Sequence, residues 1–229
     1  MDLNNPAILH SNRRCPYSLR ARMVLSYANI SINLTEVSLK EKPEARVPVL
    51  HFSDGKIIDN SRDIMLWALD QNDPDNWYSF LGKQKRLKVD NLVSHNDDNF
   101  KPLLDRYQYA DRYPAYSQTE YRTAAERFLK QLQRLLGQHQ CLFGETVSLA
   151  DIAIFPFIQQ FILVDEQWFE QSSYNNIQLW YRALLETDLY QQVIGNTSPK
   201  NPDQEHQSCQ GLGKLLQALN HSNQTNEPK

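Results

Sequence analysis

The stretch VPVLHFSDGKIIDNSRDIMLWALD, residues 47–70, decides the fold of the first part of this chain. Its apolar runs VPVLHF and KIID flank the letters SDG, and an Asp-Gly pair between two apolar runs is a strong signal for a β-hairpin. The residues from 64 to 69 follow and are strongly apolar, as in a buried helix. The stretch therefore predicts two antiparallel strands and then a helix.

The residues before this stretch predict a strand, a helix and another strand. AILHS at 7–11 is a short apolar run with β-propensity, and a turn-like NRR follows it. We expect a helix to begin at Pro16. Proline is favoured at the first helical position, because the N–H that it lacks would have no partner there. ISINLTEVSL at 30–39 alternates apolar and polar residues, as a half-buried strand does. We therefore expect β-α-β, a hairpin and a helix, which is an α/β arrangement.

The rest of the chain shows helical patterns, and no convincing strand follows residue 84. Ser148 and Asp151 form a variant capping box before an apolar run that predicts a central, buried helix. Residues 177–194 predict one further amphipathic helix. We expect an α/β domain at 1–70, a polar linker at 71–84, an all-helical domain at 85–195 and a polar, largely disordered tail at 196–229. The predicted fold class is thus α/β plus all-α.

Composition excludes several classes of function. The chain has 41% hydrophobic and 22% charged residues with a net charge of −3, whereas nucleic-acid and anionic-membrane binders usually carry a basic excess. It contains no apolar run approaching the roughly 20 residues of a membrane-spanning helix, and no secretory signal is apparent at its start. Three widely spaced cysteines do not resemble a disulfide framework, so we expect a cytoplasmic protein.

Cys15 is the main candidate for chemistry. A thiol at the start of a helix faces unpaired N–H groups and the positive end of the helix dipole, which stabilises a nearby anion by up to about 2 kcal/mol. Four arginines add positive charge at positions 13, 14, 20 and 22. The alternative is a small packed apolar residue, but the strand–turn–helix context favours a reactive thiolate. Because Ser18 stands where a C-x-x-C motif has its second cysteine, we expect a monothiol.

Two further positions are candidates for ligand binding. Pro48 begins a strand, where a cis Val47–Pro48 bond would turn the preceding backbone toward a ligand, although trans is the commoner state of such bonds. Asn60 or Ser61 can cap the helix that follows, and a helix start can also bind a carboxylate.

Other candidates are weaker. His95, Asp97 and Asp98 match no metal-site spacing and are interpreted as a solvated helix face, so we expect no metal. Tyr107 and Tyr109 can line an aromatic pocket or pack in the core. Cys141 is interpreted as a packed apolar residue.

Four segments together resemble the cytosolic glutathione S-transferase superfamily, over roughly residues 5–195. They are RRCPYSLRARM, VPVL, DGKIIDNSRDIMLWAL and SLADIAIFPF. The branch that they resemble is the cysteine-containing one, with omega-like and bacterial transferases and glutaredoxin-2-like proteins nearby. The resemblance implies a thioredoxin-like N-terminal domain followed by a helical-bundle C-terminal domain.

The resemblance also implies roles for individual residues. Cys15 takes the place of the catalytic cysteine, Pro48 matches the family's cis-proline, and Val47 matches the residue whose backbone pairs with the cysteinyl part of glutathione. Ser61 matches the serine that holds the γ-glutamyl carboxylate, and Asn60 stands where the family usually has Glu or Gln.

Two regions of the chain complete the implied site. The stretch Lys40–Arg46 is shorter than in relatives, which usually have a helical turn there. Lys40 or Lys42 is a candidate to contact the glycyl end of glutathione, and Lys42 is the one that we assign to the site. The second-substrate pocket is expected between the domains, with Tyr17, Tyr107 and Tyr109 as its residues.

We therefore expect a glutathione-dependent transferase with thioltransferase or dehydroascorbate-reductase-like chemistry. The Cys15 thiolate would attack a small oxidised or electrophilic substrate, and glutathione would be the co-substrate. The alternative is a non-catalytic binding or regulatory protein on the same scaffold. Neither nucleic acid nor membrane is an expected partner, and the family resemblance makes a homodimer possible.

Overall fold

A computed structural model describes residues 6–42 and 44–195, and contacts divide the chain into two compact units. Unit 1 runs to Leu81 and, among the described residues, also includes Asp188–Gly195. Unit 2 comprises Gly82–Thr187. The tail predicted at 196–229 lies outside the described residues. None of the described helices is both long and apolar enough to cross a membrane.

Unit 1 is built on a four-stranded mixed sheet in the order β2-β1-β3-β4. The strands are β1 (Ala7–Ser11), β2 (Ile32–Glu36), β3 (Val49–His51) and β4 (Ile57–Ile58). β1 pairs parallel with β2 and antiparallel with β3, and β3 pairs antiparallel with β4. The hairpin predicted from SDG is confirmed, and Gly55 has a φ of 87°, a left-handed conformation that glycine adopts without steric cost.

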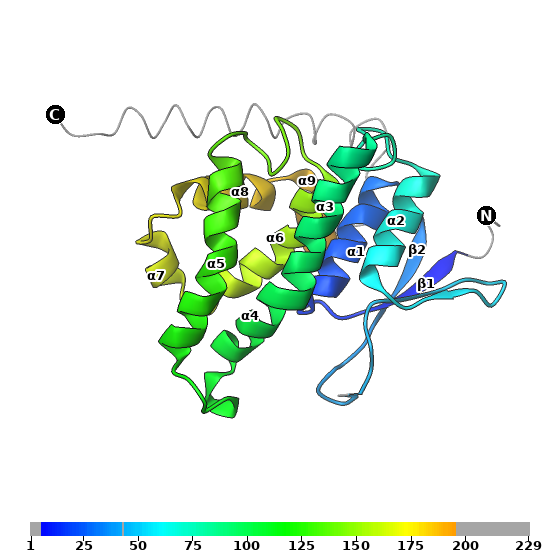
Figure 1. The fold of residues 1–229 in the computed structure, drawn as a ribbon. Helices are drawn as coiled ribbons and strands as arrows, with labels where there is room; N and C mark the ends of the chain where they lie inside the picture. The colour runs from blue at the N-terminus through cyan, green and yellow to red at the C-terminus, as the bar shows by residue number, and fades with distance from the viewer. Residues whose placement is uncertain (1–5, 43, 196–229) are drawn as a thin grey trace. The chain divides into compact units, whose positions relative to one another are not determined.

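Two helices of unit 1 follow strands as predicted. α1 (Pro16–Tyr27) begins at the predicted proline, and α2 (Ser61–Gln71) follows β4. They lie side by side (Figure 1). Leu9 and Leu50 are neighbours in the sheet and fully buried, as are Met23 of α1 and Met65 of α2. This apolar layer holds β1 and α1 in place, and Cys15 lies between them, directly before α1.

The described residues between β2 and β3 form no helix. Residues 37–48, of which all but residue 43 are described, form turns and irregular backbone. The backbone N–H groups of Glu41 and Lys42 both donate to the Ser38 carbonyl, at 3.2 and 2.9 Å. The short Lys40–Arg46 stretch thus leaves room for one turn and no second helix between these strands.

A local hydrogen-bond network around Asp73 stabilises residues 72–81, which follow α2 in unit 1. The Asp73 carboxylate accepts the backbone N–H groups of Trp77, Tyr78 and Ser79 at 2.7, 2.9 and 2.7 Å. It also accepts the Tyr27 hydroxyl of α1 at 3.1 Å, and the Tyr27 ring stacks on Trp77. Trp77 is only 1% exposed. A segment of polar appearance therefore contributes a buried indole to the core of unit 1.

Unit 2 is helical. Its main helices are α3 (Lys83–His95), α4 (Lys101–Gln108), α5 (Gln118–Leu136), α6 (Leu149–Ile162), α7 (Glu166–Glu170) and α8 (Asn175–Leu185). A π-helical turn at Asn96–Phe100 joins α3 to α4 just before Pro102, whose missing N–H interrupts regular α-helical bonding there. α6 is buried along nearly its whole length, as predicted from its apolar sequence.

The predicted capping box of α6 is confirmed and extends further than two residues. Asp151 accepts the backbone N–H and the hydroxyl of Ser148 at 2.9 and 2.7 Å. Its other oxygen accepts the Leu142 N–H and the Trp180 indole N–H, both at 2.9 Å. One buried carboxylate therefore joins the loop before α6 to α8.

The single helix predicted at 177–194 is wrong. α8 ends at Leu185, and a separate helix, α9 (Asp188–Gly195), belongs to unit 1. The Thr187 hydroxyl donates to the Leu184 carbonyl at 2.7 Å and ends α8, while Asp188 begins the next helix. α9 packs against α1, where the Arg22 guanidinium donates to the Val193 carbonyl near the end of α9.

Candidate functional site

Cys15 occupies the N-cap position of α1. Its backbone is extended, with φ −85° and ψ 119°, and its carbonyl accepts the first helical bond, from the Leu19 N–H at 3.0 Å. Its side chain makes no capping bond and is half-buried. The thiol therefore stands at the positive end of a 12-residue helix without being used to close that helix.

The Val47–Pro48 segment faces the thiol. The Val47–Pro48 peptide bond is cis, and the Cys15 Sγ lies 3.8 Å from the Val47 carbonyl oxygen. Ser18 stands where a C-x-x-C motif has its second cysteine. It is buried, and its hydroxyl accepts the Asn12 N–H at 3.2 Å. Two segments 32 positions apart are thus brought together at Cys15, while Ser18 stabilises the turn before it.

The start of α2 holds Asn60 and Ser61 in different roles. The Asn60 amide oxygen caps the helix by accepting the Arg62 N–H at 2.8 Å. Ser61 is the first helical residue and is 4% exposed. Its hydroxyl accepts two N–H groups of Arg20, from Nε at 3.0 Å and from Nη2 at 2.8 Å. The Arg20 guanidinium also lies 4.9 Å from the centre of the Tyr17 ring.

Sequence reasoning counted Arg20 only as one of several positive charges near Cys15. In the structure it is 1% exposed and reaches from α1 to α2, 41 positions along the chain. A faint signal was present, because Arg20 stands four residues before Val24 and seven before Tyr27, on a face of α1 that packs inward.

Lys42 is placed in a different environment. Its side chain is exposed, in the turn that follows β2. The described residue that its charge affects is His10 of β1, whose pKa is lowered by burial first and then by the charges of His51 and Lys42. The rings of His10 and His51 lie 4.9 Å apart on neighbouring strands. No described contact joins the Lys42 side chain to Cys15 or Ser61, so its part in ligand binding stays a prediction.

Comparisons with known proteins decide the family. A family model described as glutathione S-transferase, N-terminal domain, matches residues 9–77, and one described as glutathione S-transferase, C-terminal domain, matches residues 103–183. The chain belongs to the glutathione S-transferase superfamily. The fold class is thereby confirmed, with a thioredoxin-like mixed sheet in unit 1 and helices in unit 2.

Solved structures of this superfamily share the fold at low sequence identity. The glutathione transferase URE2P6 from Phanerochaete chrysosporium, in complex with oxidised glutathione, has a TM-score of 0.72 and 17% identity over 86% of this chain and 98% of its own. A family member from Pseudomonas fluorescens with two glutathione bound has a TM-score of 0.69 and 15% identity, with coverages of 85% and 94%. A serine-to-cysteine mutant of poplar glutathione transferase F1 has a TM-score of 0.68 and 16% identity, with coverages of 83% and 97%.

The three tyrosines predicted to line a second-substrate pocket of this transferase lie in different surroundings. Tyr17 is half-buried on α1 in unit 1. Tyr107 of α4 is 2% exposed in unit 2, and its ring packs 5.1 Å from that of Phe161. Burial raises the pKa of Tyr107. Tyr109, which ends α4, is 38% exposed, and Arg112 covers its ring at 4.8 Å. Tyr17 and Tyr109 thus offer more surface to a ligand than Tyr107 does.

Residues interpreted as non-catalytic are accounted for by packing. Cys141 is fully buried, and burial raises the pKa of its thiol. His95 bonds to Gln131 of α5 at 2.9 Å and contacts the Phe128 ring. Within the described ranges, no three His, Cys, Asp or Glu side chains are grouped to hold a metal ion.

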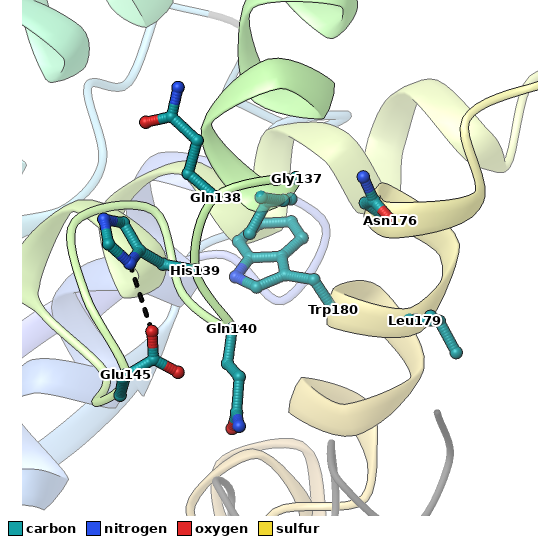
Figure 2. A pocket seen from close by; sticks show the side chains of 9 residues that line it. Gly137, Gln138, His139, Gln140, Glu145, Asn176, Leu179 and Trp180 are labelled. Carbon is teal, nitrogen blue, oxygen red and sulfur yellow. Dashed lines mark hydrogen bonds and ion pairs between the residues drawn. The ribbon is translucent and has the colours of Figure 1, made fainter. Parts of the chain in front are cut away.

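A hollow of about 320 Å³ lies in unit 2 and contains none of the predicted site residues. It lies between the end of α5, the loop that follows and α8 (Figure 2). His139 and Glu145 form an exposed ion pair at its rim, and the Trp180 side chain lies at its centre in Figure 2. The Trp180 indole N–H already donates to Asp151. Trp180 therefore lines this hollow as part of the hydrogen-bond network that joins α6 to α8.

Proposed function

We propose that this chain is a cysteine-type glutathione transferase that catalyses thiol–disulfide exchange. The observation that carries the proposal is the half-buried Cys15 Sγ at the start of α1, 3.8 Å from the Val47 carbonyl oxygen. A helix N-terminus favours the thiolate, which is the nucleophilic form of cysteine. Val47 and Pro48 would bind the cysteinyl part of glutathione, Ser61 and Asn60 its γ-glutamyl group, and Lys42 its glycyl end.

The reaction proceeds in two exchanges. The Cys15 thiolate attacks the glutathione sulfur of a glutathionylated small substrate, so that a new S–S bond forms and the substrate leaves as a thiolate that takes a proton from water. A second glutathione thiolate then attacks the mixed disulfide. Oxidised glutathione leaves, and the Cys15 thiolate is restored. Because Ser18 supplies no second thiol, resolution requires this external glutathione.

The test is disulfide reduction by glutathione in the wild type, in Cys15→Ser and in Cys141→Ala. We expect Cys15→Ser to fall to the uncatalysed rate, because a hydroxyl is a far weaker nucleophile than a thiolate. Cys141→Ala should retain the wild-type rate, since that thiol is buried in unit 2. Equal, background-level rates in the wild type and in Cys15→Ser would refute the proposal that this chain catalyses the exchange.

The second candidate is a binding or regulatory protein on the same scaffold. It is favoured by Asn60, which is uncharged and already caps α2, and by the missing helix between β2 and β3. Calorimetric binding of glutathione without turnover would support it. A cytoplasmic location and a homodimer remain further predictions, and light scattering of the purified chain measures the second.

A further inference from the structure

The buried contact between Arg20 and Ser61 is unusual enough to need an explanation. A guanidinium loses strong hydration when it is buried, so it is retained inside proteins where hydrogen bonds or charges compensate. Arg20 is 1% exposed, and two of its N–H groups converge on one serine hydroxyl at 3.0 and 2.8 Å. Its guanidinium carbon also lies over the Tyr17 ring, 4.9 Å from the ring centre.

This contact changes what the Ser61 hydroxyl can do. A serine hydroxyl has one proton to donate and two lone pairs that accept. Because both lone pairs face Arg20, the proton is left to point away from it, and Ser61 acts as a donor. A cation behind the hydroxyl polarises the O–H bond and strengthens the hydrogen bond that it donates.

A donor-only hydroxyl backed by a positive charge suits an anionic acceptor. Ser61 also begins α2, an 11-residue helix whose N-terminal N–H groups favour negative charge. The Ser61 residue retains only 4% exposure, so it offers little surface to a ligand. A carboxylate meets these requirements, because its oxygens only accept.

We infer that Arg20 is a positioning residue, which fixes Ser61 as a donor and makes this subsite selective for the α-carboxylate of the γ-glutamyl group. The inference rests on the proposed function, because glutathione is the ligand. Arg20 acts through Ser61, so its removal weakens recognition of one group of the ligand and leaves the remaining contacts unchanged. Selectivity between two ligands therefore separates this role from a loss of stability.

The test compares glutathione with γ-aminobutyryl-cysteinylglycine, which lacks the α-carboxylate and keeps the rest of the peptide. Calorimetry on the full chain should show that the wild type binds glutathione at least about tenfold more tightly, the effect of one hydrogen bond to a charged group. Arg20→Gln should lose most of this preference, because it binds glutathione several-fold more weakly than the wild type does and binds the analogue as tightly as the wild type does.

Arg22→Gln is the matched control. Arg22 lies two residues further along the same helix, is 7% exposed, and donates to the Val193 carbonyl of α9. Its replacement should lower the unfolding temperature and leave the preference for glutathione unchanged. If Arg20→Gln does not fold by circular dichroism, Arg20→Lys takes its place. It should lose several-fold of the preference, because an ammonium lacks the planar fork.

Three results would overturn the inference. One is a full preference for glutathione in the Arg20 variant that folds. Another is a loss of preference in Arg62→Gln with none in the Arg20 variant, which would move the role to the exposed first turn of α2. The third is a wild type that binds both ligands equally well. A wild type that binds neither ligand would instead refute the proposed function itself.

Discussion

Asp151→Asn tests the network that joins α6, its preceding loop and α8. The carboxylate is fully buried and receives four hydrogen bonds, two on each oxygen. All four partners donate, so both oxygens must accept. An asparagine of the same shape keeps one oxygen and loses least with its NH₂ group toward Ser148, whose hydroxyl can turn to accept while its backbone N–H is left without an acceptor.

The expected cost follows from that donor and from the lost charge. A buried donor without a partner costs about 1–3 kcal/mol, and the hydrogen bonds that remain lose the extra strength that a charged acceptor gives them. Burial raises the pKa of Asp151, which shows that ionising this carboxyl is itself unfavourable, and removing the charge returns part of the loss. We therefore expect a decrease of about 2–4 kcal/mol in the free energy of unfolding, against a typical total of about 5–15 kcal/mol.

Urea unfolding followed by circular dichroism measures this change. Glu145→Gln is the matched control, because Glu145 lies in the same loop with its side chain 62% exposed and pairs only with His139 among the described contacts. It should change the free energy by less than about 0.5 kcal/mol. An Asp151→Asn protein as stable as the control would show that the four bonds do not hold unit 2 together.

Three further predictions concern stability and reactivity. Tyr27→Phe removes a hydroxyl that donates to Asp73 and accepts the Asp75 N–H at 2.7 Å, so urea unfolding should show a free energy of unfolding lower by about 1–2 kcal/mol. An unchanged free energy would show that the hydrogen-bond network at 72–81 does not stabilise unit 1. The lowered pKa of His10 means that the unfolded chain binds its proton more readily, so stability should fall as the pH drops below about 6.5, and His10→Asn should flatten this fall. Finally, peptide mass spectrometry after iodoacetamide treatment should find Cys141 unmodified in the native protein and modified in urea, because burial blocks access and raises the pKa of its thiol.

Local patterns predicted the elements whose causes are local. The Asp54-Gly55 turn, the proline that begins α1 and the capping box of α6 each depend on residues within a few positions of one another. Their stereochemistry is the same in any fold, so the sequence alone was sufficient to place them.

Features that depend on distant partners could not be predicted in this way. Arg20 is buried against Ser61, 41 positions away, whereas an arginine on a helix is normally solvated. The break between α8 and α9 interrupts a continuous apolar pattern. α8 belongs to unit 2, whereas α9 belongs to unit 1 and packs there on α1. Likewise, Trp77 is buried within a polar sequence, and its ring stacks on Tyr27, 50 positions earlier in the chain.

The candidate site shows the same division. Cys15 and its position before a helix were predictable from neighbouring residues, and so was a cap at Asn60 or Ser61, of which the structure shows Asn60. The approach of Cys15 to Val47 was implied only by family resemblance, because 32 positions separate them. Lys42 illustrates the limit, since its sequence position suggested ligand binding and the described structure places its charge near His10.

The central claim is that Cys15 carries glutathione as a mixed disulfide. The most direct measurement is peptide mass spectrometry, without reductant, after brief treatment of the protein with a glutathionylated small thiol and no free glutathione. We predict that the wild type and Cys141→Ala gain the mass of one glutathione on the peptide containing Cys15, that Cys15→Ser gains none there, and that added glutathione reverses the change. A wild type that stays unmodified at Cys15, or a modification that added glutathione does not remove, would contradict this account.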